Sequence, residues 1–171
     1  VATVTCTFYG IQILTYSLAQ SVIVSKNKIN NFLWRSASAA TTVPGVWTGI
    51  YTTTSRGTIG GVIGNGNTIG CANGTDSIIV EISNTGSGTL ISGIELAGAS
   101  STSILTSVKN NLIGGITIKS ISSAGVASAT NGAVFRGIGV ATTGLNNTID
   151  SNIIGNYTAN NIKYGTAVTS T

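Results

Sequence analysis

The residues that could carry acid–base or metal chemistry are few and widely spaced. The chain of 171 residues has no histidine, and its four carboxylates are Asp76, Glu81, Glu95 and Asp150. Without histidine there is no Ser-His-Asp or Cys-His arrangement, and the commonest metal ligand is missing. A glycosidase needs two carboxylates at one site, and Glu81 and Glu95 could supply them only if folding brings them together. We therefore expect solvated surface acids, no enzymatic activity, no bound metal and no cofactor.

Large aromatic side chains are the next candidates for a binding site, because exposed rings stack on sugars and anchor protein interfaces. Trp34 and Trp47 flank segment 36–46, which is rich in alanine and holds the only proline. This composition predicts a loop, and we expect a second loop over 122–132. Trp34, Trp47 and Tyr51 are candidate contacts for a surface polysaccharide or a protein partner. The alternative is that the two tryptophans cover the flank of the structure beneath the loop.

Two short motifs recur along the chain in the same order. The first is Gly-Ile, which occurs at Gly10, Gly49, Gly93 and Gly137, with spacings of 39, 44 and 44 residues. The second is Asn-x-Ile followed by Asn or Gly, which occurs at Asn27, Asn67, Asn111 and Asn152. Segments such as FYGIQI and ISGIEL alternate between polar and aliphatic residues, the pattern of a strand with one buried face. A repeat of this length predicts a stacked solenoid.

Each repeat holds both motifs about half a repeat apart, which predicts a coil of roughly 20 to 22 residues and about eight coils. We expect an all-β, right-handed parallel β-helix that forms one segment over residues 1–171. Aliphatic side chains from every coil would fill its core, and strands would pair in parallel between coils. The four motif asparagines would lie at equivalent turns, because asparagine tolerates a left-handed conformation and its amide can bond to the neighbouring coil.

Composition and charge limit the partners. Only 7% of residues are charged and 42% are hydrophobic, and the net charge of +4 comes from scattered basic residues. Scattered charge argues against a nucleic-acid partner, and no apolar run reaches the roughly 18 to 20 residues that span a bilayer. Neither end resembles the polar cap that closes a solenoid. We therefore expect a piece of a longer chain that pairs with neighbouring β-helix segments or with copies of itself.

The recurring Gly-Ile-x-aliphatic segments, the Asn-x-Ile turns and the charge-poor Thr/Ser/Asn/Gly spacers resemble a known group of proteins. They are similar to the right-handed β-helix segments of large surface proteins, including adhesins, that gliding and related Bacteroidetes-type bacteria export by the type IX route. The resemblance implies an extracellular or cell-surface location and a structural role as a shaft, spacer or filament module. Because these motifs specify a fold and not a reaction, a carbohydrate-binding or carbohydrate-cleaving β-helix domain is the alternative.

Overall fold

The computed structural model describes residues 7–14, 21–37, 40–53, 57–83, 89–97, 105–120, 133–141, 146–156 and 161–166. These residues form sixteen β-strands and no helix, which confirms the all-β class. The predicted loop 122–132 lies outside the described residues, as do residues 38–39 of the predicted loop 36–46. Within the described ranges, no helix is long and apolar enough to cross a membrane.

The strands form four sheets of four strands each. Sheet A contains β1 (Phe8–Ile13), β5 (Trp47–Thr52), β9 (Thr89–Leu96) and β13 (Ala133–Val140). Sheet B contains β2 (Val22–Val24), β6 (Gly57–Gly60), β10 (Leu105–Lys109) and β14 (Asn146–Asp150). Sheet C contains β3 (Lys28–Ile29), β7 (Thr68–Gly70), β11 (Leu112–Gly114) and β15 (Ile153–Ile154). Sheet D contains β4 (Phe32–Ser36), β8 (Ile78–Ile82), β12 (Ile116–Ser120) and β16 (Ile162–Thr166).

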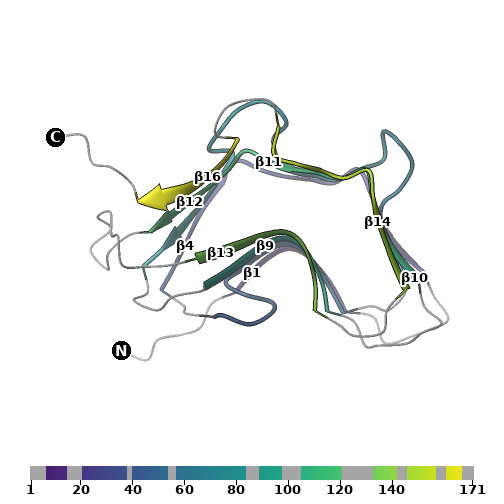
Figure 1. Ribbon diagram of the computed structural model, residues 1–171, viewed down its shortest axis with the longest axis horizontal. Coiled ribbons are helices and arrows are strands. Elements are labelled where there is room, and N and C mark those ends of the chain that lie inside the picture. The colour runs from purple at the N-terminus through teal and green to yellow at the C-terminus, as the bar shows by residue number, and fades with distance from the viewer. Residues whose placement is uncertain are drawn as a thin grey trace.

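Four consecutive strands make one layer, so layer 1 is β1–β4, layer 2 is β5–β8, layer 3 is β9–β12 and layer 4 is β13–β16 (Figure 1). All strand pairs are parallel, as expected, and each strand pairs with the strand one layer away. Ile11 pairs with Ile50, which pairs with Ile94, which pairs with Ile138. Pairing therefore follows the full repeat. The expected coil of 20 to 22 residues is wrong, and the described strands make four layers instead of eight coils.

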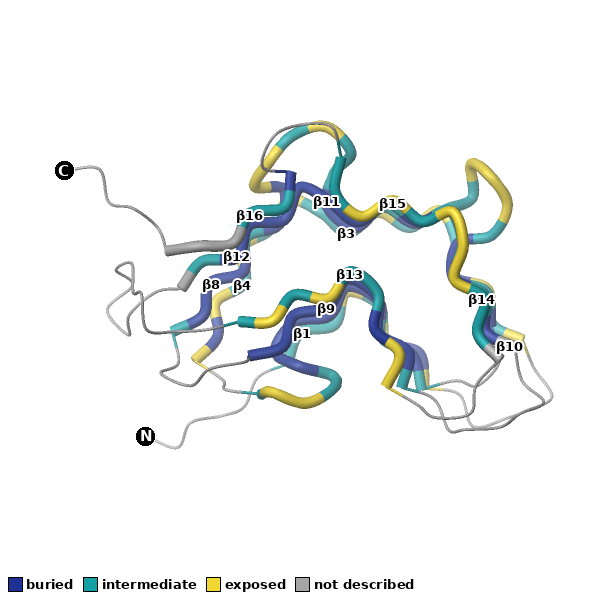
Figure 2. The backbone as a smooth tube through the Cα atoms, viewed as in Figure 1, coloured by how far each residue is buried: buried dark blue, intermediate teal, exposed yellow. Residues whose placement is uncertain are grey.

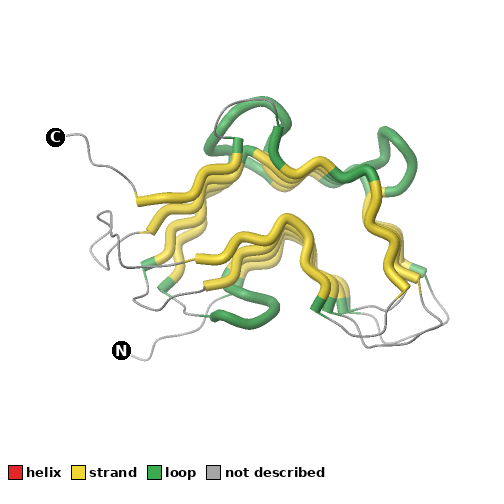
Figure 3. The backbone as a smooth tube through the Cα atoms, viewed as in Figure 1, coloured by secondary structure: helices red, strands yellow, loops and turns green. Residues whose placement is uncertain are grey.

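The coil length was wrong because the two sequence motifs face each other across the core of one layer. A Cβ atom built on Gly10 would lie 2.8 Å from Ile29 Cδ1 and 2.6 Å from the carbonyl oxygen of Gly49 in the next layer. The same contact between a glycine and an isoleucine joins Gly49 to Ile69, Gly93 to Ile113 and Gly137 to Ile154. Sheet A bends toward sheet C in the middle of its strands (Figure 3). Only glycine leaves room there for both the isoleucine and the neighbouring backbone.

The core lies on either side of the point where sheet A bends toward sheet C. Most inward-facing side chains of layers 2 and 3 are buried (Figure 2). The inward residues are mainly isoleucine, valine and leucine, whose branched side chains suit the pleated surface of a sheet. Between sheets A and D they are joined by Trp47 and Phe8. Among the described strands, layers 2 and 3 therefore have a neighbouring layer on both sides, and layers 1 and 4 on one.

Two segments outside the strands pack against the stack. The ends of the described part of the predicted loop 36–46 are held on β9, since Val46 N donates to Leu90 O and Leu90 N donates to Ala40 O, each at 2.9 Å. Between these ends, Thr41 and Thr42 are exposed and the loop extends away from the strands (Figure 3). Residues 71–77 of layer 2 extend over layers 3 and 4 in the loop at the top left of Figure 1. Asn161 Nδ2 of layer 4 donates to Gly74 O at 2.8 Å. This segment therefore ties layer 2 to layer 4.

Candidate functional site

The motif asparagines Asn27, Asn67, Asn111 and Asn152 form one hydrogen-bonded column, the asparagine ladder, between sheets B and C. The Nδ2 atoms of the first three donate to the Oδ1 atom of the asparagine in the next layer at 3.0, 2.8 and 2.9 Å. Their backbone nitrogens donate to the same Oδ1 atoms at 3.1, 3.0 and 3.0 Å. Each Oδ1 that receives these bonds thus accepts two, and every layer is linked to the next by side chains as well as by strands.

The remaining amide hydrogens of the ladder bond to backbone carbonyls near the ends of the sheet B strands. Asn67 Nδ2 donates to Val24 O at 2.8 Å, Asn111 Nδ2 to Ile59 O at 2.9 Å, and Asn152 Nδ2 to Val108 O at 2.8 Å. These bonds repeat with the same geometry from layer to layer. Because Asn67 and Asn111 are buried, full pairing of their amides removes the cost of an unsatisfied polar group in the core.

The left-handed conformation expected at the ladder belongs to other residues. Lys26, Asn110 and Ser151, which precede three of the ladder asparagines, have φ angles of 58°, 57° and 55°. No ladder asparagine has a positive φ. The turn is therefore made one residue earlier, and what selects asparagine at the ladder is an amide that can donate and accept at the same time.

The tryptophans predicted to contact a glycan are part of an aromatic cluster in the core. Trp47 is 0% exposed, and Trp34 is half-buried. The Phe8 ring lies 5.1 Å from that of Phe32, 5.3 Å from that of Trp34 and 6.3 Å from that of Trp47. A fully buried ring cannot stack on a sugar, so the predicted platform is wrong for Trp47. The cluster instead fills the space between sheets A and D in layers 1 and 2.

Tyr51, the third predicted contact, lies on the outer face of sheet A. Its neighbours Ile50 and Thr52 are buried, whereas Tyr51 is half-buried and its ring stacks on that of Tyr9 at 5.1 Å and 28°. Burial, followed by the influence of Tyr51, raises the pKa of Tyr9. Burial also raises the pKa of Tyr51, with a smaller contribution from Glu95 in the next layer. Both phenols are therefore neutral hydrogen-bonding groups at neutral pH.

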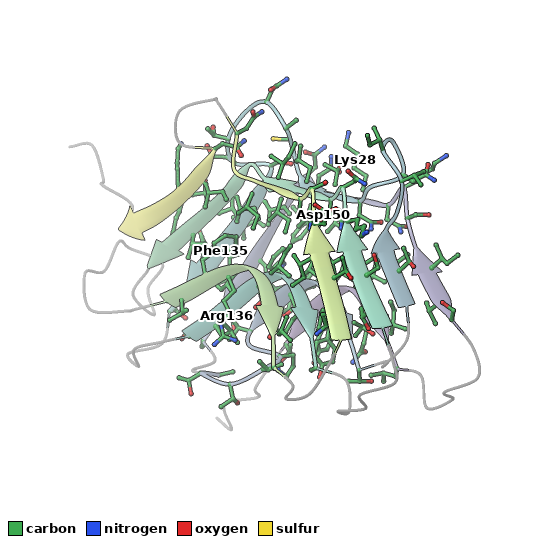
Figure 4. The ribbon with its side chains drawn as sticks, turned by 45° about the vertical axis from the view of Figure 1, so that its right-hand side comes forward. Lys28, Phe135, Arg136 and Asp150 are labelled. Atoms are coloured by element: carbon green, nitrogen blue, oxygen red, sulfur yellow. The ribbon has the colours of Figure 1, made fainter. Side chains whose placement is uncertain are left out.

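Glu95 and Arg136 continue this outer row into layers 3 and 4. The Glu95 side chain is 0% exposed, its Oε2 accepts a hydrogen bond from Ser92 Oγ at 2.8 Å, and its Oε1 lies 3.7 Å from an Arg136 guanidinium nitrogen. Burial raises the pKa of Glu95, against the opposing effects of the Ser92 hydrogen bond and the Arg136 charge. Arg136 lies on the side of β13 away from Phe135 (Figure 4). The row formed by Tyr9, Tyr51, Glu95 and Arg136 is the only described surface that combines stacked rings with a buried carboxylate.

Other carboxylates lie apart from this row. Glu81 is on the outer face of sheet D, where its Oε2 accepts hydrogen bonds from Arg35 at 2.6 and 2.9 Å. Asp76 accepts a hydrogen bond from Thr117 Oγ1 at 2.5 Å, which is the main cause of its lowered pKa, and lies 3.5 Å from Lys163 Nζ. Glu81 and Glu95 thus face outward from opposite sheets and share no site. No group of three metal-ligating side chains occurs in the described residues.

The Glu95–Arg136 pair is not among the residues predicted from the sequence, although the repeat contains the signal. Aligning the four Gly-Ile segments places Arg136 in the column of Ser92 and Gly139 in the column of Glu95. The absent side chain of Gly139 gives the Glu95 carboxylate its space, because a Cβ atom there would overlap Oε2.

No protein-family model matches the chain, and no curated protein or solved structure is significantly similar to it.

Proposed function

We propose that this chain is a segment of a right-handed parallel β-helix that serves as a non-enzymatic shaft or spacer in an extracellular surface protein or filament. The observation that carries the proposal is the asparagine ladder, which links all four layers through side-chain amides. Buried amide ladders are a feature of very stable stacked-strand assemblies. A shaft needs this kind of continuous linkage, because load applied along the stack passes through every junction between layers.

The handedness and the regular stacking are part of the same proposal. In Figure 1 the path from β13 through β14 and β15 to β16 runs anticlockwise, and the chain comes toward the viewer from the purple to the yellow end. This path supports a right-handed coil. The pairing of Ile11, Ile50, Ile94 and Ile138 supports a coil whose length equals one Gly-Ile repeat.

The shaft role is tested on the native polypeptide in the cells that make it. An antibody against the chain should label the surface of intact cells, and on a denaturing gel it should detect a product much larger than the 17.2 kDa of this sequence. Electron microscopy of that product should show a rod or a filament. Labelling confined to the cell interior, or a compact product of 17 kDa, would overturn the proposal.

The outer row of sheet A favours glycan binding as a second candidate function. The stacked rings of Tyr9 and Tyr51 and the Arg136 guanidinium are the partly exposed members of this row, while the buried Glu95 lies behind Arg136. Aromatic faces next to a charged hydrogen-bonding group suit sugar rings. In this candidate, Tyr51→Ala abolishes binding to a polysaccharide from the producing cell surface, whereas Tyr51→Phe retains it. Equal binding by wild type and Tyr51→Ala, or no binding by wild type, would exclude the row as a glycan site.

A further inference from the structure

One of the four connections between sheets B and C is longer than the other three. In layers 1, 3 and 4, two residues separate the last inward-facing residue of the sheet B strand from the ladder asparagine, as Lys109 and Asn110 do in layer 3. In layer 2, residues 60–66 take their place and project from the stack as the loop at the upper right of Figure 1. Residues 61–66 are called the projecting turn below.

The tip of the projecting turn is apolar and open to solvent. Val62 and Ile63 are 70% and 90% exposed, and Ile63 is the most exposed large hydrophobic side chain among the described residues. Figure 2 shows the exposed colouring at the end of this loop. The turn belongs to layer 2, which has a layer on each side, so its exposure does not depend on where the stack ends. Two adjacent apolar side chains held in water mark a contact surface.

The backbone of the tip forms a closed turn. Asn65 N donates to Val62 O at 2.9 Å, which places Ile63 and Gly64 at the corner of a β-turn. Gly64 has a φ of 85°, the left-handed conformation that the third residue of a type II turn requires. The tip therefore presents its apolar side chains on a formed turn.

Both neighbouring layers hold the base of the projecting turn. From layer 3, Lys109 O accepts a hydrogen bond from Gly61 N at 3.2 Å, and Asn110 Nδ2 donates to Gly61 O at 2.6 Å. From layer 1, Lys26 N donates to Asn65 O at 3.1 Å. Because the base is bonded on two sides, Val62 and Ile63 cannot fold back onto the stack without breaking these bonds.

Lysines surround the base of the projecting turn. Lys26 and Lys109 contact it through their backbones, and Lys28 lies close by on the outer face of β3, at the upper edge of the stack in Figure 4. Three of the eight basic residues of the chain thus meet at the corner between sheets B and C. On the described strands of these two sheets, Asp150 is the only carboxylate. The corner therefore carries a net positive charge.

We propose that the projecting turn docks this side of the stack on an anionic lipid membrane, with Val62 and Ile63 inserted among the lipids and the lysines facing the headgroups. Attachment at a membrane surface combines apolar groups that enter the acyl boundary with basic residues that attract anionic lipid. The turn supplies the first and Lys26, Lys28 and Lys109 supply the second. This contact goes beyond the shaft role, because it gives one side of the shaft a surface to lie on.

A protein partner fits the same corner less well. A stable protein interface buries at least about 1,000 Å² in total, whereas the apolar part of this surface is two side chains on one turn. Lysine is also depleted at the centre of protein interfaces, but here lysines lie directly beside the apolar tip. A bilayer needs no matching pocket and accepts a small apolar tip ringed by positive charge.

The first experiment measures cosedimentation with vesicles that mix phosphatidylcholine and phosphatidylglycerol. Wild type should bind, and Ile63→Asn should bind about fivefold more weakly, because it removes most of the apolar surface at the tip. Leu33→Asn is the matched control, since Leu33 is also exposed but lies on the outer face of sheet D, at the far side of the stack (Figure 1). No binding by wild type, or equal binding by Ile63→Asn and Leu33→Asn, would overturn the proposal.

The second experiment tests the lysines at constant net charge. Lys26→Gln/Lys28→Gln should weaken binding to the same vesicles about tenfold. Lys119→Gln/Lys163→Gln removes the same charge from sheet D and should bind like wild type. Circular dichroism confirms that both double variants fold. Equal losses in the two variants, or equal binding of wild type to pure phosphatidylcholine vesicles, would contradict recognition of anionic lipid by this corner.

The third experiment distinguishes insertion from adsorption. Lipids with brominated acyl chains should quench the fluorescence of Ile63→Trp but not that of Leu33→Trp. The native Trp34 and Trp47 belong to the aromatic cluster and contribute the same background to both variants. Binding without quenching at position 63 would overturn insertion. A rod on the cell surface whose chain ignores these vesicles would leave the shaft role standing, so the two proposals can fail separately.

Discussion

Layers 3 and 4 carry the same residues at the asparagine ladder and at the isoleucine that follows it, but only layer 3 has a described layer on both sides. Asn111 and Ile113 are buried, while their partners Asn152 and Ile154 retain contact with solvent. Both asparagines accept two hydrogen bonds from the layer below, and both isoleucines lie against a glycine. Position in the stack, and not the local contact, therefore decides how much a residue contributes to stability.

The largest expected difference in stability is between alanine substitutions at two ladder asparagines, Asn111 in layer 3 and Asn152 in layer 4. Asn111→Ala should destabilise the fold by roughly 4 kcal/mol, because it leaves the buried backbone and side-chain donors of Asn67 without an acceptor. Asn152→Ala should cost only about 1 kcal/mol, since Asn152 itself is half-buried and its truncation opens the donors of Asn111 to water. Chemical denaturation followed by circular dichroism measures both. Equal losses in the two variants would mean that the end layer is covered in solution.

A second pair tests the contact between the Gly-Ile and Asn-x-Ile motifs. Ile113→Ala should destabilise the fold by about 3 kcal/mol, because it opens a cavity opposite Gly93 in the covered layer. Ile154→Ala opposite Gly137 should cost about 1 kcal/mol, because half of that side chain is already exposed. Thermal denaturation at a concentration too low for association provides the comparison. A loss at Ile154 as large as that at Ile113 would contradict the dependence on layer position.

The same comparison explains what the sequence could and could not predict. Period-two alternation around Gly10, Gly49, Gly93 and Gly137 was enough for the all-β class and the parallel pairing. It did not reveal the coil length, because two motifs half a repeat apart can be stacked in successive coils or opposed across one coil. Only the packing of Ile29 on Gly10 distinguishes these arrangements.

The candidate site was harder to predict, because outer and inner faces alternate at single-residue steps. Trp47 begins β5 and belongs to the core, whereas Tyr51 in the same strand faces outward. The number of residues before the bend at Gly49 decides which face each one occupies, and composition contains no information on where the bend lies. The prediction of a solvated Glu95 is wrong for a related reason, since its burial depends on Arg136 and on the missing side chain of Gly139.

The third prediction concerns the buried carboxylate of layer 3. Because burial raises the pKa of Glu95 in the folded state above its ordinary value of 4.5, the stability that it contributes is present below pH 4.5 and is lost as pH rises through the folded-state pKa. Glu95→Gln keeps a partner for Ser92 and removes the buried charge, while Arg136 remains partly solvated. It should stabilise the fold at pH 7 by on the order of 1 kcal/mol.

The pH dependence of this gain is the control. At pH 4 the wild-type carboxyl is largely neutral, so the difference between wild type and Glu95→Gln should shrink toward zero. Denaturation of both proteins at pH 4 and pH 7 measures the difference directly, and the contribution of Asp76, which is common to both, cancels. A loss at pH 7 would mean that Arg136 fully compensates the charge, and a gain that is equal at the two pH values would mean that the gain does not come from the charge; either result would contradict the prediction.

The smallest expected effect is at the ion pair between layers 1 and 2, in which the Arg35 side chain is exposed and the Glu81 side chain is largely buried. Arg35 donates two hydrogen bonds to Glu81 Oε2, but the arginine side chain is 55% exposed, so solvent and salt screen most of the attraction. Arg35→Ala should therefore cost only about 0.5 kcal/mol, and the cost should fall as sodium chloride is raised to about 1 M. Denaturation at low and high salt measures this change. A cost that matches that of Asn111→Ala would show that this outer-face pair stabilises the fold as strongly as the buried ladder does. A cost that does not depend on salt would show that solvent does not screen the pair. Either result would contradict the expected difference between buried and exposed contacts.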